Sequence, residues 1–321
     1  MNGFSSKHLI FLILALSVCS MTTYTQVLTS TGKNNTWIAI SVSSAIILIF
    51  MMYISKILKS AEKYSIPEIY ENAAGKIAGK AAVLLLTLTI FLGIIESSSV
   101  LTNCVHKVRL NNTPVWFIEL FIIVPSIYIL KSKKNAIISL TVIIITVICI
   151  VGIFLAAFGF RYKHFHYLLP IMQNGFDRDF MLTVFKSLGL YGFSFCAILF
   201  LDEINNKKTL LKDVLLGMLI LIQIQIYSMV SLLSNFYSKR INTIYYPKIM
   251  QTQLINYYGF IENGELIASF ALVCSWITKY ILLFYILIKL LNFLNINSKY
   301  NIYIVSVIVY FISCFIAGNI E

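Results

Sequence analysis

Two ionisable residues stand inside apolar stretches of the sequence, where a charge is costly. Lys279 lies near the middle of the stretch 264–293, and Glu96 lies in the second half of the stretch 81–102. A charged side chain at the centre of a membrane costs roughly 3 kcal/mol on insertion scales, so each calls for a reason. The Lys279 ammonium is a candidate for a fixed charge that replaces a coupling cation. Glu96 is its candidate partner, although the sequence does not place the two side chains together.

A run of polar side chains from Ser17 to Gln26 interrupts the first apolar stretch. Within it, Ser20, Thr22 and Thr23 are candidate contacts for a small ligand. The alternative is that these hydroxyls bond to carbonyls of their own helix or to a neighbouring helix, as is common in membranes. The run contains no glycine or proline that would favour an unwound segment, so both interpretations stay open.

A glycine pair marks the middle of the stretch 181–201. Gly189 and Gly192 lie on either side of Tyr191, and glycines at this spacing lower the cost of breaking a helix. Amides freed there would attract a carboxylate, because the N-terminus of a half-helix carries partial positive charge. All three residues are therefore candidate ligand contacts. The alternative is a close packing face between helices, made by small residues.

Other ionisable residues favour structural roles. Lys186 and Glu119 lie near the ends of their apolar stretches, where long side chains extend toward the interface. For His164 and His166, an interfacial belt of aromatic and basic residues is favoured over a metal site. The sequence has no H-E-x-x-H, G-x-S-x-G or phosphate-loop motif. We therefore expect no catalytic residue, no metal and no cofactor.

The composition indicates that lipid is the main solvent of the chain. Its 321 residues are 59% hydrophobic and 12% charged, about half the charged share of a soluble domain. Backbone polar groups find no partner in lipid, so continuous apolar runs must be helices. The net charge of +12 comes from lysines between these runs, which are topology signals and not a nucleic-acid site. The six scattered cysteines are typical of small buried apolar residues.

These runs predict an all-α polytopic membrane protein with about nine spans in one transmembrane domain, residues 1–321. The first run lacks an A-x-A-like cleavage site and is interpreted as a span, not as a signal peptide. Lysine and arginine are more frequent in loops on the side of the N-terminus, which predicts that this end is cytoplasmic. The expected spans are 8–30, 37–58, 81–102, 114–130, 136–160, 181–201, 213–237, 264–293 and 301–318.

The loop lengths predict two related halves. A short loop and then a long loop follow the first two spans, and the same order recurs after the sixth and seventh spans. The halves begin on opposite sides of the membrane, which is the pattern of an inverted repeat. We expect a five-helix repeat over 8–160 and a four-helix repeat over 181–318, so one helix of a five-plus-five fold is missing. In the first long loop, Ser65–Glu68 predicts the start of a surface helix and Gly75 its end.

Several stretches resemble the GerAB-type spore germination proteins, members of the amino acid–polyamine–organocation transporter superfamily. Their shared order over residues 7–290 carries the resemblance. The similar stretches are Lys7–Leu12 at the first span, Asn35–Ala39 at the second, Glu68–Lys80 in the cytoplasmic segment, Asn112–Trp116 before the fourth, Leu168–Ile171 before the sixth, and Tyr258–Glu262 and Trp276–Lys279 at the eighth.

The resemblance implies a LeuT-type helical fold. It also implies a role in sensing small nutrients, chiefly amino acids, that trigger spores to leave dormancy. Family members act in the spore inner membrane with two partner subunits, a larger membrane protein and a lipoprotein. This chain departs from the family at Asn263, where an arginine is typical, and near Phe193 or Ser194, where an acidic residue is frequent.

Three functions follow as hypotheses. The favoured one is the transporter-like subunit of a spore germinant receptor, in which a small nutrient such as an amino acid contacts spans 1, 3, 6 and 8. Binding would then shift a conformational equilibrium. The second is an active amino acid permease that works by alternating access. The third is a scaffold subunit that lacks its tenth helix.

Overall fold

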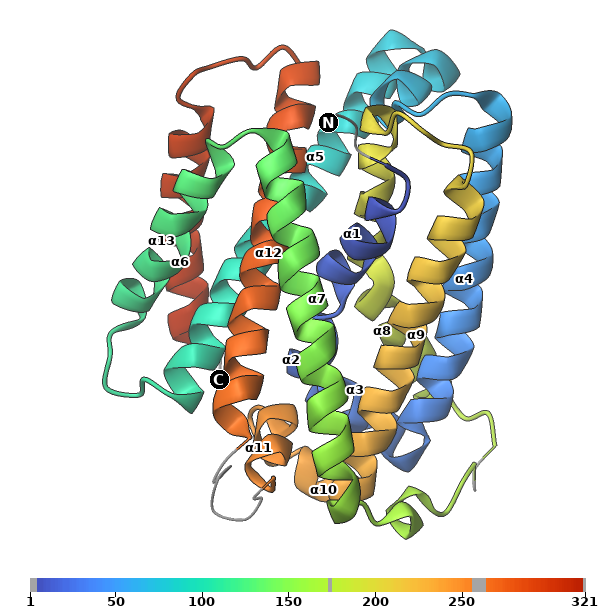
Figure 1. The fold of residues 1–321 in the computed structure, drawn as a ribbon, viewed down its shortest axis with the longest axis vertical. Coiled ribbons are helices and arrows are strands. Elements are labelled where there is room, and N and C mark those ends of the chain that lie inside the picture. The colour runs from blue at the N-terminus through green and yellow to red at the C-terminus, as the bar shows by residue number, and fades with distance from the viewer. Residues whose placement is uncertain (1–4, 173–174, 256–263, 320–321) are drawn as a thin grey trace.

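The computed structural model describes residues 5–172, 175–255 and 264–319, which form an all-α bundle (Figure 1). Within these residues, seven helices are long and apolar enough to cross a membrane. Two shorter apolar segments, His8–Thr23 and Val115–Leu130, stand at the first and fourth expected spans. The chain is therefore a multi-pass membrane protein, as expected. The family-like stretch Tyr258–Glu262 and Asn263 lie outside the described residues.

Every expected span falls on helical segments, and their bounds follow the apolar stretches closely. Short helices fill several of the connections between them. In chain order the elements are α1 (His8–Ser17), α2 (Ser20–Thr23), α3 (Thr25–Gly32), η1 (Lys33–Asn35), α4 (Thr36–Ala61), α5 (Ile66–Val108), α6 (Val115–Leu130), α7 (Lys134–Gly159), η2 (Phe160–Tyr162), η3 (Phe165–Leu168), α8 (Arg178–Leu188), η4 (Gly189–Glu203), α9 (Leu210–Asn235), α10 (Ser238–Ile241), α11 (Pro247–Gln253), α12 (Glu265–Phe293) and α13 (Asn301–Asn319).

The first span is broken into three short helices. α1 ends at Ser17, and α3 begins only after Tyr24, whose backbone angles (φ −96°, ψ 11°) leave the helical region. Threonines lower helix propensity here, because their side chains are branched and their hydroxyls compete for backbone carbonyls. The break therefore forms without the glycine or proline that we associated with unwinding.

The sixth span changes its helical geometry at the predicted glycine. α8 begins after Asp177, whose carboxylate accepts a hydrogen bond from the Phe180 amide, 2.8 Å away. At Gly189 the chain passes into η4, a 3-10 helix that continues to Glu203. A 3-10 helix is tighter and longer per residue than an α-helix, and long runs of it are uncommon. The sixth span is thus tightened rather than unwound.

α5 joins a surface helix to the third span. It follows Ser65, as predicted, although the Ser65 side chain makes no capping hydrogen bond. Gly75 interrupts it with φ 80° and ψ 168°, a backbone conformation that favours glycine. The predicted end of the surface helix at Gly75 is therefore confirmed.

The spans pack in two groups (Figure 1). α1, α4, α8, η4 and α9 pack together, while α5, α6, α12 and α13 form the second group. α7 contacts α1 on one side and α12 on the other, and α1 itself also reaches α12. The broken first span therefore lies at the junction between the groups. Large apolar side chains such as Leu84, Leu88 and Phe311 are exposed, as expected for lipid-facing surfaces.

Candidate functional site

Lys279 and Glu96 meet between α12 and α5. The Nζ atom of Lys279 lies 3.0 Å from Oε2 of Glu96. The Lys279 side chain is completely buried, whereas the Glu96 side chain keeps 28% of its surface exposed. A buried charge needs an opposite charge in a low dielectric, and each side chain supplies it to the other. The structure thus brings together the two charged residues that the sequence singled out.

Tyr24 joins this ion pair from the break in the first span. Its hydroxyl donates a hydrogen bond of 2.5 Å to Oε1 of Glu96. Its ring meets the ring of Trp276 edge-on, with 6.5 Å between the centroids. Because Tyr24 separates α2 from α3, a rearrangement of the break would displace this hydrogen bond. The ion pair is therefore connected to the conformation of the first span.

Two aromatic rings face the Lys279 ammonium. Its Nζ atom lies 4.1 Å from the ring centroid of Phe193 and 4.6 Å from that of Trp276. Such cation–π contacts are worth about 2 kcal/mol when they are desolvated. Phe193 belongs to η4, so the sixth span reaches the same site. Spans 1, 3, 6 and 8, the four expected to contact a ligand, all contribute a side chain.

Gly93 makes room for the Phe193 ring. It lies one helical turn before Glu96 on α5, and a Cβ atom at Gly93 would stand 2.4 Å from Cε1 of Phe193. Any side chain at this position would therefore displace the Phe193 ring. The position of the Phe193 ring next to the Lys279 ammonium therefore depends on the space at this glycine.

The predicted threonine contacts bond to their own helix. The Thr22 hydroxyl donates to the carbonyl of Cys19 at 2.6 Å, and the Thr23 hydroxyl donates to that of Ser20 at 3.4 Å. Ser20 itself is buried. For the two threonines, this is the alternative that we weighed against ligand binding. They stabilise the turn that leads to Tyr24, while their contact with a ligand stays a prediction.

Some buried polar atoms around the site lack a partner. Within the described part of the chain, no hydrogen bond is formed by Oγ of Ser17, Oγ1 of Thr25 or Nε1 of Trp276. Buried polar groups are normally paired, so each exception calls for an explanation. Two of these atoms flank the break in the first span, and the third belongs to a ring that faces Lys279. Their hydrogen-bonding capacity is therefore unused in this arrangement.

The glycines of the sixth span point away from neighbouring helices. Gly189 and Gly192 are both exposed, and a Cβ atom at either would meet no atom within 4 Å. The alternative interpretation, a close packing face between helices at these glycines, is therefore wrong. Tyr191 is buried, and its hydroxyl lies 2.6 Å from that of Ser44 on α4. Of this part of the span, the residue that reaches the Lys279 ammonium is Phe193.

Three aromatic residues of the site were missed from the sequence: Tyr24, Phe193 and Trp276. Trp276 stands three positions before Lys279, a spacing that places two residues on the same face of a helix. Tyr24 directly follows the threonines of the polar run. The helical spacing would have found Trp276, whereas Phe193 was noted only because it stands near the frequent acidic position of the family.

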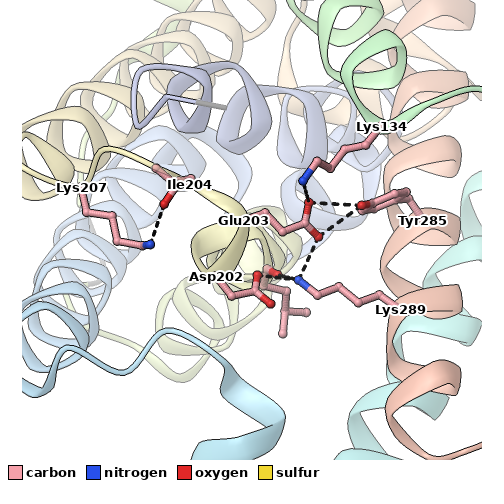
Figure 2. Close-up of polar contacts among 8 residues, drawn as sticks. Lys134, Asp202, Glu203, Ile204, Lys207, Tyr285 and Lys289 are labelled. Carbon is pink, nitrogen blue, oxygen red and sulfur yellow. Dashed lines mark hydrogen bonds and ion pairs between the residues drawn. The ribbon is translucent and has the colours of Figure 1, made fainter. Parts of the chain in front are cut away.

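A second ionic cluster holds the other end of η4 (Figure 2). Nζ of Lys289 lies 2.5 Å from Oδ1 of Asp202 and 3.0 Å from Oε1 of Glu203. Nζ of Lys134 lies 3.1 Å from Oε2 of Glu203. The Tyr285 hydroxyl donates to the same carboxylate at 3.2 Å. The end of η4 is therefore tied to α7 and α12.

α12 contacts η4 at two levels. Lys279 touches Phe193 near the start of η4, and Lys289 binds its carboxylates at the end. At 1.5 Å per residue, the two lysines are about 15 Å apart along α12. A movement of η4 relative to α12 must therefore disrupt both sets of contacts.

Protein encloses the Lys279 end of the ion pair. The surface grooves along α4 are lined by other residues, Tyr53 and Lys56 among them. The Lys279 ammonium is therefore not reached from either groove.

A family model described as spore germination protein matches residues 4–320. This match covers both helix groups and every residue of the site around Lys279. No curated protein matches the chain.

Proposed function

Because the chain belongs to the spore germination protein family, we propose that it is the transporter-like subunit of a spore germinant receptor that senses a small nutrient. The observation that carries this proposal is the Lys279–Glu96 ion pair, which Tyr24 joins at the break in the first span. Transporters bind small polar ligands at discontinuous helices near the middle of the membrane, and the ion pair lies beside such a break. An amino acid permease that shares this site is the alternative function.

An amino acid is the ligand class that fits the ion pair best. A zwitterion carries one carboxylate and one ammonium, so it can bond to Lys279 and to Glu96 at the same time. This exchange leaves neither buried charge without a partner. The unpaired Nε1 atom of Trp276 supplies a further donor for the carboxylate. The rings of Phe193 and Trp276 provide apolar surface for a side chain.

The contacts of Tyr24 and Phe193 give binding a structural consequence. A zwitterion between Lys279 and Glu96 would displace the Tyr24 hydroxyl and separate Phe193 from the ammonium. These contacts hold the first and sixth spans in the observed arrangement. A ligand shifts such an equilibrium only by binding one arrangement more tightly than the other. Movement of η4 would then also break the cluster around Lys289.

The signal would pass to two partner subunits, a larger membrane protein and a lipoprotein, in the spore inner membrane. We place the N-terminus in the cytoplasm, on the basis of the lysine and arginine distribution. This orientation puts the Lys289 cluster at the cytoplasmic end of η4. The break in the first span then lies in the outer half of that span, and a nutrient enters from this side.

The experiment is germination of spores that carry Lys279→Met or Glu96→Gln. We expect both to lose the response to the nutrient when germination is normalised to the amount of the protein that immunoblots show. Lys186→Met, which changes a partly exposed lysine on α8, is the control and should respond normally. A normal nutrient response in Lys279→Met spores would contradict the proposal.

Uptake into vesicles separates the receptor from the permease. The purified chain is reconstituted alone, and labelled amino acids are added outside. A receptor subunit should give no saturable uptake. Saturable uptake that Lys279→Met abolishes would favour the permease, with the same binding site.

A further inference from the structure

Glu119 is completely buried at a place separate from the Lys279 ion pair. It lies one turn inside α6, and its side chain points into the bundle, so the expectation that it extends to the interface is wrong. The hydroxyls of Ser98 and Thr102, both on α5, each bond to one of its carboxyl oxygens. Ser313 of α13 is close enough to interact with the same carboxyl group, although its hydroxyl makes no hydrogen bond to any described residue. Hydroxyl groups from two neighbouring helices therefore surround this acid.

No positive charge balances Glu119. Among the residues that the structure describes, no lysine, arginine or histidine forms an ion pair with it. The titratable groups that interact with it electrostatically are Tyr280 on α12 and Tyr310 and Cys314 on α13. From α5, its neighbours are hydroxyl groups. Phenols and thiols are neutral at physiological pH, so none of these groups compensates a carboxylate.

A neutral acid satisfies this environment. An ionised carboxylate without a partner is strongly disfavoured in a closed apolar site, and proteins usually avoid it by protonation. Hydroxyl groups both donate and accept, so a protonated carboxyl keeps its contacts with Ser98 and Thr102.

We propose that Glu119 is a proton-binding site, whose carboxyl group is protonated at neutral pH. The proton is enclosed by α5, α6, α12 and α13, so its release requires that α6 or α13 moves away from α5. α5 also carries Glu96, and α12 carries Lys279 directly before Tyr280. Proton occupancy at Glu119 is therefore linked to the packing of the two helices that hold the ion pair.

Infrared spectroscopy of the purified full-length protein tests this proposal. The wild type at neutral pH should show the carbonyl stretch of a protonated carboxylic acid, and Glu119→Gln should lose it. Glu68→Gln, which changes an exposed acid on the surface helix, should keep the band. Ser98→Ala removes one hydrogen bond and should shift the band. That shift assigns the band to Glu119 even if Glu119→Gln does not fold.

Two outcomes would overturn the proposal. One is a wild-type spectrum without the band, or with a band that neither Glu119→Gln nor Ser98→Ala changes. The other is a wild-type thermal stability that rises with sodium chloride but not with N-methylglucamine chloride, together with no such rise in Glu119→Gln. This result would assign an alkali cation, in place of a proton, to the site.

Discussion

The Lys279 ammonium lies 3.0 Å from the Glu96 carboxylate, at the junction between two groups of membrane helices. Glu96 also accepts the Tyr24 hydrogen bond, so a single carboxylate connects the broken first span to the eighth span. Because Phe193 faces the same ammonium, the sixth span depends on this pair as well. A ligand that separates the two charges would therefore affect every helix that the site joins.

Removing one member of the ion pair should destabilise the protein. Lys279→Met leaves the Glu96 charge without its partner, and loss of one partner from a buried pair costs about 3–5 kcal/mol. The partial exposure of Glu96 places the expected loss near the lower figure. The double variant Lys279→Met with Glu96→Gln should recover most of the stability that Lys279→Met loses. Thermal unfolding of the purified proteins measures both effects.

Lys134→Met is the control for the ion-pair variants, because it removes a partly exposed pair worth about 0–1 kcal/mol. Equal stability of Lys279→Met and the wild type would contradict a structural role for the buried pair. A double variant that is as unstable as the single one would show that packing, and not charge, explains the loss.

Gly93→Ala should displace the Phe193 ring from its place beside Lys279. The new methyl group would stand 2.4 Å from Cε1 of Phe193, and overpacking of this kind costs about 1–3 kcal/mol. Phe193→Leu should restore stability in the Gly93→Ala background, because the shorter side chain leaves room. Gly152→Ala on α7 is the control, since its Cβ meets no atom within 4 Å. Absence of rescue by Phe193→Leu would refute the proposed contact.

Lys289→Met should loosen the end of η4. Without Lys289, the carboxylates of Asp202 and Glu203 lose their shared cation, and η4 separates more easily from α12. In a protein that keeps only Cys196, which is buried in η4, maleimide labelling should become several-fold faster. Lys207→Met is the control, because Lys207 donates to the Ile204 carbonyl at the same end. Identical labelling rates in the two variants would count against the cluster.

Lys248, outside the spans, should make stability depend on pH. Its ammonium donates to the Ser228 carbonyl and to Gln251, and burial, aided by the Lys163 charge, lowers the pKa of Lys248 to about 7. Unfolded lysine has a pKa of about 10.4, so the unfolded chain binds more protons between about pH 7 and 10. The free energy of unfolding should therefore rise with pH across this window.

Thermal unfolding at a series of pH values measures the Lys248 effect. The wild type should gain stability toward alkaline pH, and Lys248→Met should show a smaller gain. Lys239→Met, at an exposed lysine of the same loop, should behave as the wild type does. A gain that is unchanged in Lys248→Met would assign the pH dependence to another group.

The fold followed from the sequence because lipid leaves the backbone few choices. Long apolar runs had to be helices, and Gly75 ended the surface helix through a backbone angle that suits glycine. The break in the first span was harder to predict, because no glycine or proline marks it. It depends on threonine hydroxyls that bond to nearby carbonyls, at Thr22 and Thr23.

Only part of the site could be predicted. Lys279 and Glu96 stand out because a charge inside an apolar run is expensive. Phe193 was noted only for its place near the acidic position of the family, and its contact with Lys279 depends on space at Gly93 that only tertiary packing reveals. The direction of the Glu119 side chain also escaped prediction, because α6 is apolar on all faces and its pattern does not define an inner side.

Trp276 offers the most direct test of nutrient binding between Lys279 and Glu96. In a protein with Trp37→Phe and Trp116→Phe, Trp276 is the remaining tryptophan, and its ring faces the ammonium. An amino acid that triggers germination should change the Trp276 emission saturably, and Lys279→Met or Glu96→Gln should abolish the change. The opposite result would be a germination-active amino acid that leaves the emission unaltered, or that alters it equally in Lys279→Met.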